Sequence, residues 1–307
     1  MHLAEGILPL EQAMVFSAAG AATLAWSIRG EQRARQDDGT PSVLMAGITS
    51  LLFAVTLLPL PVPVVGATSH ICLTPVLALI IGVRRIIWPT FFVLLLQALF
   101  FAHGGLTTLG VNTLSLGLVG PLATIGLWAF FQRVGLGNAL GLSIACGAGG
   151  LVVYVADAFV LAMALADMAD PITTFIGVVL GFAPVQVPLA VLESAASVAM
   201  IRLLATRRPD LLPDALQSLR KPAMPVTTSA IVLSVFGVSG CSYEGIDGTV
   251  FGAVAESAGR APTQSLVDLS QGEVGLAMSI LILFGLGFIA GRSWERIFNR
   301  GRDALQR

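Results

Sequence analysis

Nine apolar runs follow one another along the 307 residues, and they limit this chain to folds that fit a lipid bilayer. A helix needs about 20 mostly apolar residues to cross the hydrocarbon layer. The third and eighth runs are shorter, so we expect them to be tilted, broken or enclosed by neighbouring helices. The predicted spans are residues 10–28, 43–60, 71–82, 86–102, 114–131, 138–163, 173–203, 226–240 and 273–291.

Charged residues are too few for a soluble domain of this length. Hydrophobic residues make up 55% of the chain and charged residues only 11%, whereas a soluble protein has about 25% charged residues. The predicted fold class is therefore all-α and polytopic, with a seven-helix core followed by two C-terminal transmembrane helices. A formal net charge of −1, without any long basic run, argues against a nucleic-acid partner.

Basic residues occur at every second boundary between the runs, and this pattern predicts an orientation. Arginines follow the first, third, fifth, seventh and ninth runs, whereas Arg260 is the only basic residue at the alternate boundaries. Because basic loops stay in the cytoplasm, we predict nine spans with the N-terminus outside and the C-terminus in the cytoplasm.

A change in composition predicts a division of the chain after residue 205. Residues 1–205 contain the first seven runs. Residues 206–225 are polar and contain several prolines, which is typical of a linker, here on the cytoplasmic side. Residues 226–307 hold the last two runs, joined by an outer loop rich in Gly, Ser and acidic residues.

The three histidines, His2, His70 and His103, all lie on the outer side in this topology. The amine of Met1, the deprotonated amide nitrogen of His2 and the His2 imidazole can chelate one metal ion in fused rings. His70, just before a short apolar run, can supply a fourth nitrogen. Four nitrogens in one plane suit Ni(II) or Cu(II). The alternative is that His2 is a disordered terminal residue and His70 a loop or helix-cap histidine.

The character of the N-terminal segment favours the chelate. Leu3, Ile7, Leu8 and Leu10 are too apolar for a solvated tail, so we expect the segment to fold back into the protein and bring the amine with it. Glu5 stands where a secretory signal would carry Lys or Arg, so we expect no cleavage there. Neutral imidazoles and a deprotonated amine imply metal binding that weakens at acid pH.

The third histidine, His103, ends an apolar run and is followed by two glycines that allow a sharp turn. Thr107, Thr108 and Asn112 then offer hydrogen bonds at the start of the next span. We expect His103 to orient a ligand or to line the access path; the alternative is a helix end satisfied by its own side chains. The residues predicted to support the ligands or line this path are His103, Asn112, Thr68 and Ser69.

Ionisable side chains inside predicted spans are functional candidates by default. Asp157 is predicted to lie deep enough to need a partner. Glu193 is predicted to pair with Arg202 or to face a partner subunit. Small side chains recur at every fourth position of the first span, and we predict that they pack internally rather than form a subunit interface. They are Ser17, Ala21 and Ala25.

Motifs of energy-coupled and hydrolytic enzymes are missing from the sequence. There is no Gly-x-x-x-x-Gly-Lys-Ser/Thr loop, so the chain has no ATPase motif of its own. The motifs His-Glu-x-x-His and Gly-x-Ser-x-Gly are absent too. We therefore predict that the chain is not an enzyme.

Three separated segments carry a resemblance to a known family: residues 1–9, 66–70 and 97–112. They are similar to the CbiM/NikM proteins, the substrate-specific components of energy-coupling factor transporters for cobalt and nickel, and the resemblance covers residues 1–205. In that family a metal ion is held by the N-terminal amine, the backbone nitrogen and imidazole of the second residue, and a histidine before a short helix. The resemblance thus implies Met1, His2 and His70 as ligands of a transported Ni(II) or Co(II) ion, with His103 in a supporting role.

The resemblance also implies partners and a location. Family members work with a separate transmembrane coupling subunit and cytoplasmic ATPase subunits, in the cytoplasmic membrane of a bacterium or archaeon. The last two helices are similar in layout to the small CbiN/NikN partner, here fused. Residues 71–75 depart from the Pro-Thr-Gly-Thr-Gly sequence of many members, which leaves the metal preference open and could place Cys72 near the site as a soft outer group.

Two other functions fit parts of the sequence. One is a membrane-embedded haem or redox protein that uses His70 and His103 as axial ligands. The other is a structural scaffold subunit whose outer histidines bind nothing.

Overall fold

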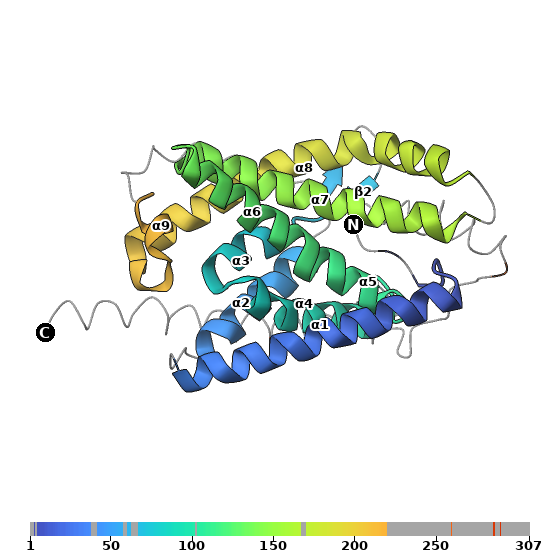
Figure 1. The fold of residues 1–307 in the computed structure, drawn as a ribbon, viewed down its shortest axis with the longest axis horizontal. Coiled ribbons are helices and arrows are strands. Elements are labelled where there is room, and N and C mark those ends of the chain that lie inside the picture. The colour runs from blue at the N-terminus through green and yellow to red at the C-terminus, as the bar shows by residue number, and fades with distance from the viewer. Residues whose placement is uncertain are drawn as a thin grey trace, which may run out of the picture.

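In its described part, the protein is a bundle of helices with one short pair of strands (Figure 1). The computed structural model describes residues 3, 5–37, 42–57, 60–62, 67–101, 103–166, 170–219, 259, 285 and 289. The longer helices are α1 (Leu10–Asp37), α2 (Ser42–Leu57), α4 (Val83–Phe101), α6 (Gly120–Arg133), α7 (Ala139–Ala164) and α8 (Pro171–Arg207). The shorter elements are β1 (Leu60–Val62), β2 (Ala67–Ser69), α3 (Thr74–Ile81), α5 (Leu109–Leu114), the π-helical turn η1 (Ser115–Val119), the 3-10 turn η2 (Pro209–Leu211) and α9 (Asp214–Gln217).

Four of the predicted spans are confirmed as helices long and apolar enough to cross a membrane. They are α4, the continuous helix Leu109–Arg133 formed by α5, η1 and α6, then α7, and α8. The protein is thus a multi-pass membrane protein built from several long apolar helices. Apart from Gly285 and Ile289, the predicted spans 226–240 and 273–291 lie outside the described residues. The seven-plus-two helix count and the division at residue 205 stay predictions.

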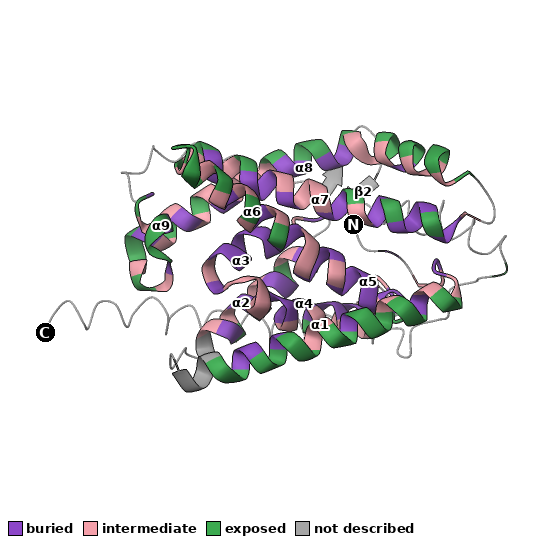
Figure 2. Cartoon of the chain, in the orientation of Figure 1, coloured by how far each residue is buried: buried purple, intermediate pink, exposed green. Residues whose placement is uncertain are grey.

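The third predicted span, residues 71–82, contains a helix shorter than the span, and its predicted enclosure by neighbouring helices is confirmed. The helix in this region, α3, has eight residues, which at 1.5 Å per residue is about 12 Å, and the hydrocarbon layer is about 30 Å thick. Every residue from Thr74 to Leu79 is buried, and α3 lies inside the bundle (Figures 1 and 2). Hydropathy reports that a run is apolar, but it does not separate a helix facing lipid from one enclosed by protein.

The strands β1 and β2 form an antiparallel pair that the sequence did not predict. Leu60 pairs with Ser69 and Val62 with Ala67. Strand β2 ends directly before His70 and contacts α8. The pair thereby leads the chain to the start of α3 with a fixed register.

The arginines that follow the first and third apolar runs lie at the same end of the bundle. Arg85 Nε is 2.8 Å from Glu31 Oε2, in a largely buried ion pair between α4 and α1. Arg84 Nε donates to the Trp26 carbonyl at 2.8 Å. The shared end agrees with the alternation of basic boundaries, while its assignment to the cytoplasm stays a prediction.

The outward faces of α1, α7 and α8 are exposed and largely apolar, as lipid contact requires (Figure 2). The expectation that the small residues of α1 pack internally is wrong, because all three are exposed. The close approach occurs instead at Gly20, where a Cβ atom would come 2.8 Å from the Gly110 Cα. The three exposed small residues of α1 are Ser17, Ala21 and Ala25.

Candidate metal site

The segment before α1 enters the protein and is fixed by hydrogen bonds to the start of α5. Asn112 Oδ1 accepts from the Leu3 amide at 2.9 Å, and Asn112 Nδ2 donates to the Leu3 carbonyl at 3.1 Å. Thr108 Oγ1 donates to the same carbonyl at 2.7 Å. Asn112 and Thr108 are themselves buried. Both polar backbone groups of Leu3 are therefore satisfied by α5 and the residue before it, as burial demands.

Apolar side chains of the same segment complete the contact. Leu3, Ile7 and Leu8 are 2–4% exposed, and they belong to one core cluster with Val111 of α5 and Ala158 of α7. The expectation that this segment folds back into the protein is confirmed for its described residues.

Glu5 and Gly6 contact the loop between α4 and α5. The Thr107 amide donates to Glu5 Oε2 at 3.1 Å, and the Gly6 amide donates to Thr107 Oγ1 at 3.3 Å. The side chains of Thr107, Thr108 and Asn112, which we expect to offer hydrogen bonds at the start of this span, bond to the N-terminal segment, and Thr108 makes no side-chain cap to α5. The sequence indicates this contact only through an apolar N-terminal segment and a group of polar side chains within residues 107–112.

Gly105 leaves the space in which Glu5 lies, and this gives a testable prediction. A Cβ atom on Gly105 would come 2.6 Å from the Glu5 Cα, so backbone would have to move. We expect Gly105→Ala to displace the segment and to lower the free energy of unfolding by about 1–3 kcal/mol, the usual cost of overpacking. Thermal unfolding of the purified protein measures this.

Gly126→Ala is the matched control, because a Cβ atom there meets nothing within 4 Å. We expect this variant to unfold at or slightly above the temperature of the parent protein, because Ala is favoured over Gly inside a helix. Equal unfolding temperatures for the two variants would contradict the proposed crowding at Gly105.

His70 and His103, from loops far apart in the sequence, lie against one another. Their ring centroids are 5.6 Å apart at an interplanar angle of 67°. His70 follows β2 and is 4% exposed. His103 follows α4, its amide donates to the Gln97 carbonyl at 3.2 Å, and Gly104 turns the chain with φ of 80°. The buried helix end predicted at His103 thus brings its imidazole to His70.

The two imidazoles are in the form that binds metals. Burial lowers the pKa of His70 well below its ordinary value and lowers the pKa of His103 to about 4. The Nε2 atoms of both rings are shielded from solvent. Both rings are therefore neutral at pH 7, and a neutral imidazole has a lone pair available for a metal ion.

The remaining predicted site residues are placed as follows. Met1 and His2 lie outside the described residues. Thr68 and Ser69 are in β2, where their backbone pairs with β1. Asn112 holds Leu3. Among the described residues no group of three or more His, Cys, Asp or Glu side chains is arranged to hold a metal ion, so His70 and His103 are the imidazoles that this part of the chain brings together.

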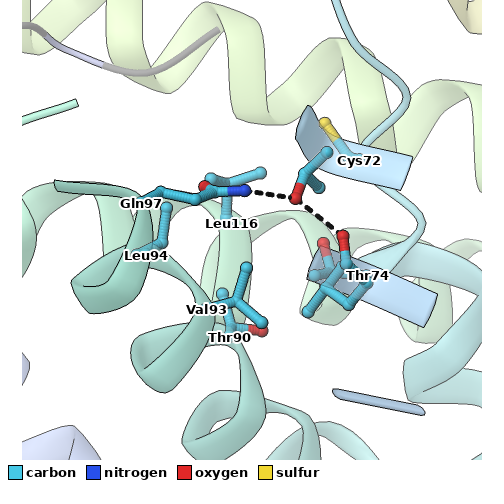
Figure 3. A pocket seen from close by; sticks show the side chains of 9 residues that line it. Cys72, Thr74, Thr90, Val93, Leu94, Gln97 and Leu116 are labelled. Atoms are coloured by element: carbon cyan, nitrogen blue, oxygen red, sulfur yellow. Dashed lines mark hydrogen bonds between the residues drawn. The ribbon is translucent and has the colours of Figure 1, made fainter. Parts of the chain in front are cut away.

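A small pocket lies between α2, α3 and α4, and Cys72 lines it rather than the outer surface (Figure 3). Gln97 donates from Nε2 to Thr56 Oγ1 at 2.7 Å. Within the described residues, Gln97 Oε1 and Thr74 Oγ1 make no hydrogen bond. Buried polar atoms around a small pocket are the usual setting for an ordered water. Burial raises the pKa of the Cys72 thiol, so the thiol is protonated here.

The helical arrangement resembles that of a solved protein. A crystal structure described as a truncated transition metal transporter superposes with a TM-score of 0.57, covering 67% of this chain and 99% of that one. The two sequences are 22% identical, so this likeness concerns the fold.

The family follows from the sequence comparisons. The model of the CbiM family, described as the cobalt uptake substrate-specific transmembrane region, matches residues 2–211. The cobalt transport protein CbiM of Geobacter sulfurreducens is 32% identical over 97% of this chain and 90% of its own length. That of Sorangium cellulosum is 36% identical over 72% of this chain and 97% of its own. The chain belongs to the CbiM family, and it is a transporter subunit and not an enzyme.

Proposed function

We propose that this chain captures Co(II) or Ni(II) at a nitrogen-rich site and presents it for import. The ligands are the Met1 amine, the amide nitrogen and imidazole of His2, and the His70 imidazole. His103 orients the His70 ring that it contacts. Such a nitrogen set suits both ions, and the curated relatives are named for cobalt.

The observation that carries this proposal is the fixed position of Leu3. Its amide and carbonyl are both held by Asn112, and its side chain is buried. Consecutive Cα atoms are about 3.8 Å apart, so an anchored third residue limits how far the first two can lie from α5. A segment that served only as a solvated tail would gain nothing from three buried hydrogen bonds to one residue.

Partners and orientation complete the proposal. The chain works with a separate transmembrane coupling subunit and with cytoplasmic ATPase subunits, because the sequence has no phosphate-binding loop of its own. The metal site faces the outside of a bacterial or archaeal cytoplasmic membrane, and residues 226–307 act as a fused CbiN/NikN-like segment. The path inward opens when the core moves against the coupling subunit.

The test is the metal content and affinity of histidine variants. We expect His70→Ala to lose bound Co(II) or Ni(II), because a direct ligand is removed. We expect His103→Ala to weaken binding less, by about 10- to 100-fold, the usual effect of a residue that orients a ligand. Elemental analysis after purification and calorimetric titration with each ion measure both effects, and competition between the ions decides the preference.

The result that contradicts the proposal is a His70→Ala protein that retains the metal of the parent. The alternative of a haem site uses the same two residues, His70 and His103, whose ring centroids are 5.6 Å apart. An absorbance spectrum of the purified protein separates the two, because a Soret band would favour the haem.

A further inference from the structure

A buried carboxylate on α8 contacts the loop that carries His70. Glu193 is 2% exposed, and its Oε1 accepts a hydrogen bond from the Leu73 amide at 2.9 Å. Its other oxygen lies beside Gly150 of α7, where a Cβ atom would come 2.5 Å from Oε2. The carboxylate is therefore held at the junction of α7, α8 and the start of α3, three residues after His70.

Leu73 has an unusual backbone conformation that needs this support. Its φ is 56°, the only positive value at a non-glycine residue among those described. Residues with a Cβ atom rarely adopt this left-handed region, and they keep it where neighbouring contacts hold them. Besides the bond to Glu193, the Thr74 amide donates to the Cys72 carbonyl at 2.7 Å. The path of the chain from His70 into α3 thus depends on Glu193.

The charge of Glu193 has no cationic partner in the described part of the chain. The predicted pairing with Arg202 is wrong: the ion pairs between described residues do not include Glu193, and Arg202 lies nine residues further along α8, about 13 Å away at 1.5 Å per residue. A buried carboxylate inside a membrane protein is unfavourable without a partner. A glutamine would accept the same hydrogen bond without this cost.

We propose that Glu193 is a positioning residue that holds the His70 loop and whose negative charge balances the divalent cation captured there. The inference rests on the proposed function, because it needs the cation beside His70. In the metal-free protein the carboxylate destabilises the fold. Once the cation is bound, the same charge strengthens its binding.

Two substitutions separate the charge from the hydrogen bond. Glu193→Gln keeps the shape and the acceptor for Leu73 but removes the charge. We expect it to bind Co(II) about 10- to 100-fold more weakly, with an unfolding temperature of the metal-free protein equal to or above that of the parent. Glu193→Ala removes both, and we expect a larger loss of affinity together with a lower unfolding temperature. Calorimetric titration of the purified full chain with Co(II) and thermal unfolding without metal give both values.

Glu31→Gln is the matched control, because Glu31 is also a buried carboxylate but pairs with Arg85 on α4. We expect it to lower the unfolding temperature and to leave the Co(II) affinity unchanged. The inference is overturned if Glu193→Gln binds Co(II) like the parent, or if Glu31→Gln loses affinity to the same degree.

Failure of the proposed function has a different signature from failure of this inference. A parent protein that takes up no metal, or a His70→Ala variant with parental affinity, removes the site itself. A normal His70 result together with parental affinity in Glu193→Gln removes only the role of Glu193.

Discussion

One residue added in front of Met1 is expected to abolish tight Co(II) or Ni(II) binding by the full chain. The addition turns the Met1 amine into a peptide nitrogen and moves the free amine one residue away. Because Leu3 is held on both sides by Asn112, the segment cannot slide to restore the geometry. We expect affinity to fall by about 100-fold or more, the range that linking binding groups in one segment contributes.

Calorimetric titration of the extended protein measures this loss, and the same residue added after Arg307 is the control. The unfolding temperature of the metal-free extended protein should stay near the parental value, since the contacts of residues 3–9 are unchanged. Parental affinity in the N-terminally extended protein would refute the amine as a ligand and with it the chelate.

Replacement of Asn112 by Leu is the second large effect that we expect. The substitution leaves the buried amide of Leu3 without its acceptor and removes one of two donors to the Leu3 carbonyl. Each unsatisfied buried group costs about 1–3 kcal/mol, so the N-terminal segment should detach from α5. We expect a clear fall in unfolding temperature and loss of metal binding in the same variant, measured by thermal unfolding and by elemental analysis.

Asn138→Ala is the matched control for Asn112. Asn138 is exposed, and it accepts from the Leu140 and Gly141 amides at the start of α7. Its loss should cost about 1 kcal/mol as a helix cap and leave metal binding intact. If Asn112→Leu binds metal like Asn138→Ala, the anchoring of Leu3 has no part in capture.

The long helices could be predicted because the length and hydropathy of a continuous run of residues are enough to identify them. An apolar run such as residues 138–163 forms a helix whether its side chains face lipid or the protein core, because both accept apolar side chains. In this structure that run is α7. The apolar residues of α3 face other helices, and hydropathy alone carries no information on what such residues face.

Contacts between distant residues explain most of what the sequence did not predict. Glu193 bonds to Leu73 across 120 positions, whereas the prediction joined it to Arg202, the nearest basic residue along the chain, or to a partner subunit. Asn112 was singled out as a supporting residue, and its partner in the structure, Leu3, stands 109 positions away. Chemical type can mark such residues, but only the fold decides which partners meet.

The proximity of His70 and His103 could be anticipated in part. Both were placed on the outer side by the alternation of basic boundaries, and both adjoin helix ends. Their direct contact depends on β2 and on the turn at Gly104, neither of which has a periodic signature. The chelating residues Met1 and His2 lie outside the described part of the chain, so their role stays a prediction.

The hydrogen bonds that hold Leu3 also set an order of events during synthesis. The third residue leaves the ribosome long before Asn112, yet its two backbone partners come from Asn112 and Thr108. The front of the chain must therefore wait, unpaired, until about a hundred further residues have been translated and the helix containing Asn112 has been inserted. The first part of the chain to be made therefore docks only after a later helix has been inserted.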